Sequence, residues 1–165
     1  MMTALTITDF LMATVYMAVA IWKRGELPET ISDMVYWHPK NEQWVWSAWL
    51  VMVGLLLFAL LTEKCGWMGW LTEVCLLGSA LTPLMNPDTR VWHKWLGIAT
   101  GIFSQICVVM LCPDWLFSWA VFAFIMGSVY VQPEGWLAKA VEHKGVFVAE
   151  VVCTVSLMGA LLSIH

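Results

Sequence analysis

Long apolar runs dominate this sequence and limit what it can fold into. Of its 165 residues, 61% are hydrophobic and 12% are charged, whereas about 25% of the residues in soluble domains are charged. The mean hydropathy of +0.77 indicates that the chain has too little polar surface to face water on all sides. We therefore predict an integral membrane protein, with the lipid bilayer as the solvent for most of its surface.

The runs have the length of membrane-spanning helices. A helix of about twenty residues crosses the hydrocarbon core of a bilayer, and short polar segments such as residues 63–66 separate runs of about this length. We predict an all-α, polytopic transmembrane helical bundle that forms one integral membrane domain over residues 1–165. Its six predicted spans cover about residues 7–22, 43–62, 67–85, 95–111, 114–131 and 145–164.

The basic residues predict an orientation for this bundle. Seven of the eight follow the first, third or fifth predicted span, and short cytoplasmic loops carry the excess of Lys and Arg. These seven are Lys23, Arg24, Lys40, Arg90, Lys94, Lys139 and Lys144. We therefore expect both termini to lie outside the cytoplasm. The net charge of −4 and the lack of a basic run argue against a nucleic-acid partner.

Most of the twelve tryptophans lie near the ends of predicted spans. They are Trp22, Trp37, Trp44, Trp46, Trp67, Trp70, Trp92, Trp95, Trp115 and Trp136. Amphipathic indole rings anchor helices at the level of the lipid headgroups. This distribution therefore predicts an interfacial belt before it predicts a binding site.

Residues 83–95 place two prolines, an acid, two bases and a histidine between two apolar runs. The histidine, His93, begins the fourth predicted helix, and Gly97, Thr100 and Ser104 follow it at helical spacing. We expect this polar line to point into the bundle. Gly97 and Gly101 also form a Gly-x-x-x-Gly pair, which can admit a close contact between helices.

The sixth predicted span adds a second polar line. His143 and Glu150 are seven residues apart and therefore lie on one side of the helix, and a carboxylate inside a span is costly without a partner or water. Together with the polar loops on the same membrane face, these residues predict a ligand site. Its candidate residues are Ser32, Asp33, Asp88, Arg90, His93, His143 and Glu150. We expect Asp33 and His93 to lie within one hydrogen bond or one bridging water of each other.

Each of these residues also has a structural interpretation. The acids and histidines of the loops can cap helices or contact lipid headgroups. Glu150, and Glu73 in the third span, can form hydrogen bonds to neighbouring helices. For Gln105, within the fourth span, we expect such a helix-to-helix role.

The residues Thr30-Ile31-Ser32-Asp33, followed by Pro87-Asp88 and Trp92-His93, carry a resemblance to a known family. The chain resembles a bacterial membrane family of six to seven spans, known only as a domain of unknown function, with a TISD-type signature and a downstream P-x-D-then-histidine signature. It is also distantly similar to DRAM-type membrane proteins. The resemblance covers about residues 5–110, and it departs from the second signature because Pro87 and Asp88 are adjacent. It implies a helical protein of the bacterial inner membrane with Ser32, Asp33, Asp88 and His93 at the signature positions, and it implies no activity.

The chain is also similar to the seven-span hydrolase superfamily of alkaline ceramidases and hemolysin-III-type receptors. Members of that superfamily hold zinc with three histidines beside an aspartate and a serine. The similarity implies zinc ligands at His38, His93 and His143, with Asp33 and Ser32 beside them. Three histidines and a water form a catalytic zinc set, because the open position lets the metal generate hydroxide. The chain departs from the superfamily in having one predicted span fewer and no H-x-x-x-H pair on its last helix.

Three classes of function remain open. The first is a non-enzymatic membrane protein whose cytoplasmic-side cavity binds a small polar ligand, a lipid headgroup or an ion. The second is a zinc-dependent intramembrane hydrolase of a lipid amide or ester. The third is haem binding by two histidines, which the interfacial positions of His93 and His143 argue against.

Overall fold

Helices make up nearly all of the computed structural model, which describes residues 2–85, 90–131 and 136–164, and no strand occurs in these residues. The α-helices of this part are α1 (Met2–Arg24), α2 (Gln43–Cys65), α3 (Trp67–Met85), α4 (Arg90–Leu111), α5 (Phe117–Val131) and α6 (Trp136–Ser163). Short 3-10 helices, η1 (Ser32–Trp37) and η2 (Lys40–Glu42), lie between α1 and α2, and η4 (Pro113–Leu116) lies between α4 and α5. The predicted all-α class is confirmed.

Each predicted span coincides with a helix, but the helices differ in their capacity to cross a membrane. In the described part of the chain, four helical segments are long and apolar enough to do so, namely Thr3–Arg24, Lys40–Cys65, Val91–Leu111 and Lys144–Ser163. Helix α5 has 15 residues, which reach only about 22 Å and fall short of a hydrocarbon core roughly 30 Å thick. Length and composition therefore support a spanning role for four of the six predicted spans.

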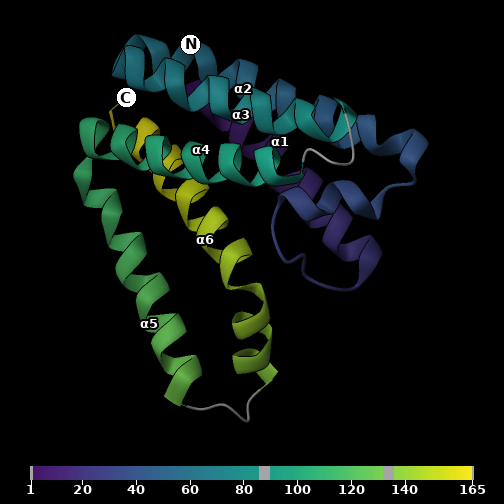
Figure 1. Cartoon of the computed structure of the whole chain (residues 1–165). Coiled ribbons are helices and arrows are strands. Elements are labelled where there is room, and N and C mark those ends of the chain that lie inside the picture. The colour runs from purple at the N-terminus through teal and green to yellow at the C-terminus, as the bar shows by residue number, and fades with distance from the viewer. Residues whose placement is uncertain (1, 86–89, 132–135, 165) are drawn as a thin grey trace.

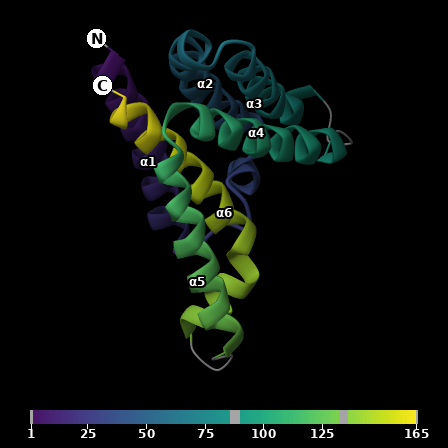
Figure 2. The same ribbon diagram turned by 90° about the vertical axis from the view of Figure 1, so that its left-hand side faces the viewer.

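The helices form two groups that meet along α4 and α6. Helices α2, α3 and α4 pack side by side, α1 packs against α2 and α6, and both α4 and α5 pack against α6 (Figure 1). Figure 2 shows α5 and the first turns of α6 as a pair that extends away from the other helices. The start of α1 and the end of α6 lie near each other in both views. Helix α6 is bent at Lys144, whose φ of −120° and ψ of 17° are not helical.

The tight turn between α2 and α3 is built on two glycines. Gly66 adopts a φ of +56° and its N–H donates to the Thr62 carbonyl over 3.1 Å, which ends α2. A Cβ at Gly69 would lie 2.3 Å from the Leu61 carbonyl oxygen. The close approach of α2 and α3 therefore requires glycine at position 69. Of the polar segment 63–66 that separates the second and third predicted spans, residues 63–65 belong to the last turn of α2, and the chain turns at Gly66.

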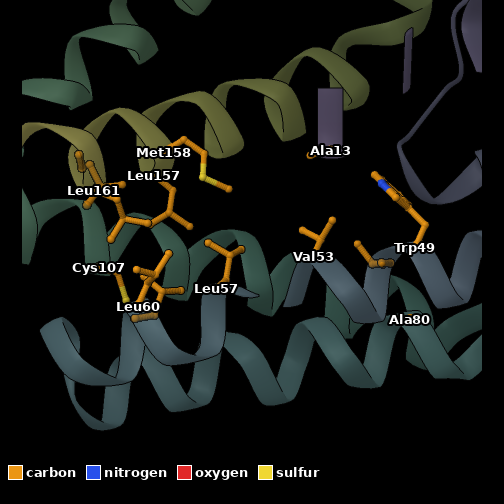
Figure 3. Close-up of a cluster of buried hydrophobic side chains, with 14 of the residues drawn as sticks. Ala13, Trp49, Val53, Leu57, Leu60, Ala80, Cys107, Leu157, Met158 and Leu161 are labelled. Atoms are coloured by element: carbon orange, nitrogen blue, oxygen red, sulfur yellow. The ribbon is translucent and has the colours of Figure 1, made fainter. Parts of the chain in front are cut away.

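The apolar core lies where α2 faces α6 (Figure 3). Leu57 and Leu60 of α2 meet Leu157, Met158 and Leu161 of α6, and all five side chains are buried. Since lipid tails are as apolar as leucine, close packing rather than removal from water stabilises this cluster in a bilayer. The packing fixes α6 against the α2–α3–α4 layer.

Gln105 links three helices through its side-chain amide. Its Oε1 accepts hydrogen bonds from Trp119 Nε1 of α5 (2.9 Å) and Ser156 Oγ of α6 (3.0 Å). Its Nε2 donates to the Cys153 carbonyl of α6 over 3.3 Å. The predicted helix-to-helix role of Gln105 is confirmed.

Candidate functional site

A cavity of about 160 Å³ lies where α1, α2, α3, α4 and α6 meet. Apolar side chains such as Val53 and Leu157 form part of its wall, and polar side chains of α3, α4 and α6 form another part. Gly97, Thr100 and Ser104 all line the cavity, so the polar line predicted on the fourth span points into the bundle.

Gly97 and Gly101 line this cavity, and no other described helix packs tightly against them. An added Cβ at Gly97 would come no closer than 3.9 Å to Ser79 Oγ, and one at Gly101 no closer than 3.8 Å to Cys153 Sγ. These are ordinary contact distances. The two glycines therefore widen the cavity.

The hydroxyl groups of the polar wall present hydrogen-bond acceptors. Thr72, Thr100 and Thr154 each donate their hydroxyl hydrogen to the backbone carbonyl four residues earlier, over 2.8 to 3.0 Å. Because a hydroxyl has one hydrogen and two acceptor lone pairs, their remaining capacity is to accept. The wall also contains Glu150, and no Lys, Arg or His is found among the described lining residues. The polar wall therefore presents hydrogen-bond acceptors and one acidic side chain.

Glu150 also fixes a loop against α6. Its Oε2 accepts a hydrogen bond from the Ile31 backbone N–H, and the Phe147 N–H donates to the Glu29 carbonyl over 3.1 Å. These contacts bring Ser32, at the start of η1, to the cavity wall beside Glu150. Two of the candidate ligand-binding residues, Ser32 and Glu150, are thus brought together.

An aromatic row closes one side of the cavity. Trp46 and Trp49 of α2 both line the cavity and have ring centroids 6.3 Å apart. Tyr16 stacks on Trp49 at 4.3 Å, and its hydroxyl lies 2.7 Å from His38 Nε2. At the other end of the row, the ring of His93 lies edge-on to Trp46 at 6.0 Å. The five rings are therefore in continuous contact, and two of them, Trp46 and Trp49, line the cavity.

The burial of Trp46 corrects the prediction that it belongs to the interfacial belt. Its side chain is fully buried, and the rings of Trp49 and His93 lie beside it. Several other tryptophans of the predicted belt are exposed, including Trp22 at 80% and Trp92 at 68%. Sequence position near a span end does not separate an inward-facing tryptophan from an anchoring one.

His93 is held next to the cavity by several hydrogen-bonding groups. Its Nδ1 lies 2.8 Å from the Ser79 carbonyl oxygen and 3.0 Å from Thr82 Oγ1. Because a carbonyl only accepts, Nδ1 carries the hydrogen and donates it. The ring is 8% exposed, and Ser79 itself lines the cavity. His93 therefore fixes the α3–α4 side of the cavity through Ser79.

The other predicted site residues fall largely outside what the structure describes. Asp88 and the side chains of Asp33, Arg90 and His143 are not among the described parts. The expected hydrogen bond or bridging water between Asp33 and His93 thus lies outside the described residues, and it stays a prediction.

His38 and His93 do not contact each other in the described part of the chain. Each imidazole contacts other groups, and three rings of the aromatic row stand between them. The described residues contain no group of three or more His, Cys, Asp or Glu placed to hold a metal ion. The third predicted zinc ligand, His143, is outside this comparison because its side chain is not described.

Two buried carboxyl groups were not among the predicted site residues. Asp9 of α1 and Glu73 of α3 are both 0% exposed, and none of their four carboxyl oxygens has a hydrogen-bond partner among the described residues. The signal available in the sequence was an acid inside an apolar span, which is costly and marks function by default. Asp9 lies close to the start of the first apolar run, where an acid resembles a boundary.

Comparison of the chain with family models, with curated proteins and with solved structures gives no match.

Proposed function

We propose that this chain is an integral membrane protein that binds a small polar ligand with hydrogen-bond donors or a positive charge in its central cavity. The observation that carries the proposal is the accepting polar wall, formed by Glu150 and by threonine hydroxyls whose hydrogens are already donated. A ligand that donates matches this wall, whereas an anion does not.

The size of the cavity and its aromatic side further limit the range of ligands that it can bind. A cavity of about 160 Å³ resembles the roughly 150 Å³ cavities that take a benzene-sized molecule. The faces of Trp46 and Trp49 attract cations and apolar groups. The Trp46 indole N–H has no partner among the described residues, so it can donate to an acceptor on the ligand. A small amine or ammonium compound with a hydroxyl group fits these features.

The resemblance to the bacterial membrane family supports placing the protein in the bacterial inner membrane. The basic residues then support an orientation with both termini outside the cytoplasm and the loop that contains Ser32 on the cytoplasmic side. Ser32, which lines the cavity, then lies toward the cytoplasmic leaflet, where a free amine or the amine of a lipid headgroup is available.

The zinc-hydrolase alternative receives no support from the described histidines. His38 is engaged by Tyr16, and His93 donates through Nδ1 to Ser79. A single metal would need both imidazoles at about 2.0 to 2.1 Å, whereas three rings stand between them. Binding rather than hydrolysis is therefore the function proposed.

A charge series of matched molecules tests the proposal. Ethanolamine, ethylene glycol and glycolate have similar size and carry positive, no and negative charge, respectively. We expect ethanolamine to raise the thermal unfolding midpoint of the detergent-purified protein most, and glycolate least. The gain should disappear in Glu150→Gln and persist in Glu63→Gln, because Glu63 is a surface residue paired with Lys64. Equal shifts from all three molecules would contradict a negative cavity.

A further inference from the structure

Asp9 and Glu73 place two carboxyl groups inside the helical core. Both side chains are fully buried, and all four of their oxygens are without a hydrogen-bond partner among the described residues. The ion pairs of the described part, Arg24–Glu26 and Lys64–Glu63, involve exposed glutamates and no buried acid. The positive charge that the two buried acids require is therefore not supplied by these basic side chains.

The packing around the pair leaves room for the carboxyl groups. Gly54 of α2 faces Glu73, and a Cβ at that position would lie 3.2 Å from Glu73 Oε2. Thr6 and Ala13 lie on the same buried face of α1 as Asp9, and Thr6 adds a buried hydroxyl there. The charge of Asp9 acts on the Glu73 carboxyl group. Ala13 and Thr72, which neighbour the two acids along their helices, line the cavity, so the pair borders the cavity wall.

Neutralising the pair requires more than removing its charge. A carboxylate buried without a partner in an apolar surrounding strongly destabilises the fold. Protons would remove the charge, but no other described residue donates a hydrogen bond to any of the four oxygens. A metal cation between the two groups would offset the charge and use the carboxylate oxygens as ligands. The four unpartnered oxygens fit this second arrangement.

We propose that Asp9 and Glu73 form an intramembrane site for a hard divalent metal cation. Two carboxylates match the charge of such an ion, and an all-oxygen set selects Mg²⁺, Ca²⁺ or Mn²⁺ over zinc or copper. The two acids supply fewer ligand groups than a zinc site needs. A hard cation can complete its coordination shell with hydroxyls, carbonyls or water. The proposed metal site does not include Glu150. Its test is therefore independent of the proposed ligand pocket.

Thermal unfolding of the detergent-purified protein tests the site, with Mg²⁺, Ca²⁺ and Mn²⁺ each compared with K⁺ at equal ionic strength. The variants are Asp9→Asn and Glu73→Gln, with Glu63→Gln as the surface control. At least one divalent ion should raise the midpoint of the wild type and of the control. Its affinity should fall at least about tenfold in each core variant. In chelator, the core variants should already be more stable than the wild type, because they lack the uncompensated charge.

Elemental analysis after dialysis against the same ions provides a readout that does not depend on stability. The wild type and the control should retain one divalent ion per chain, and neither core variant should retain it. Equal metal effects in all four proteins would overturn the proposal. A midpoint that responds to pH but to none of the divalent ions would also overturn it, because protons alone would then neutralise the pair.

Discussion

His93 and the Asp9–Glu73 pair are polar groups buried in the same bundle, but their surroundings differ. Nδ1 of His93 donates to the Ser79 carbonyl at 2.8 Å and lies 3.0 Å from Thr82 Oγ1. The carboxyl oxygens of Asp9 and Glu73 have no partner among the described residues. Hydrogen bonds within the protein offset the burial of Nδ1 of His93, whereas no described hydrogen bond offsets the burial of the two acids.

The difference separates two reasons for a polar group inside a membrane bundle. A partnered group such as His93 holds helices in position, and its loss leaves the partners unsatisfied. An unpartnered acid is a cost to the fold until something from outside binds to it. Substitution should therefore have opposite effects on stability at the two places.

The largest effect is expected from His93→Ala. Loss of the ring leaves a cavity and removes the hydrogen bond to Ser79, so the free energy of unfolding should fall by about 3 kcal/mol. Unfolding in mixed micelles, followed by circular dichroism, measures this change. The matched control is His38→Ala, since His38 is less buried and the described contact of its ring nitrogen is with Tyr16. An equal loss in both variants would remove the distinction drawn for His93.

A smaller change of opposite sign is expected from Asp9→Asn and Glu73→Gln. With divalent ions chelated, each substitution removes a buried charge without altering the shape of the side chain. The free energy of unfolding should rise by about 1 to 3 kcal/mol, measured in the same micelles. If either variant unfolds more easily than the wild type in chelator, the acid has a partner in the protein and resembles His93.

The smallest effect is expected from Gln105→Met, which tests a second partnered group. The substitution keeps the length of the side chain but removes the hydrogen bonds to Trp119, Ser156 and the Cys153 carbonyl. Hydrogen bonds between membrane helices contribute about 0.6 to 1.7 kcal/mol, and the free energy of unfolding should fall by about this amount. An increase in the free energy of unfolding would show that the hydrogen bonds of Gln105 do not offset the cost of burying its amide, as is expected for Asp9 and Glu73.

Local sequence patterns predicted the helices and the direction of the polar line on α4. Apolar runs determine where helices form, and helical spacing determines which residues share a face, so Gly97, Thr100 and Ser104 could be assigned together. The role of Gln105 was also predictable, because an amide inside an apolar helix needs a partner on a neighbouring helix.

Contacts between residues far apart in the sequence could not be predicted from local sequence patterns. The Ile31 N–H and Glu150 are 119 residues apart, and nothing in the spacing of either segment predicts that they meet. Trp46 carries the same local signal as an anchoring tryptophan, and only the packing of α2 shows that it faces inward. The association of Asp9 with Glu73 was not predictable for a similar reason, since the two acids lie in different spans and nothing in the spacing of either span relates them.

The negative character of the cavity is tested most directly by the modification of Cys153, which lines the cavity next to Thr154. In a variant whose other four cysteines are alanine, the rates of reaction with aminoethyl and sulfonatoethyl methanethiosulfonate are compared by mass spectrometry. A variant that retains only Cys112, at the end of α4, provides the reference ratio outside the cavity. We predict that Cys153 favours the cationic reagent over the anionic one by at least about tenfold relative to Cys112, and that Glu150→Gln reduces this preference. A ratio at Cys153 equal to that at Cys112, unchanged by Glu150→Gln, would contradict a cavity built for a cationic ligand.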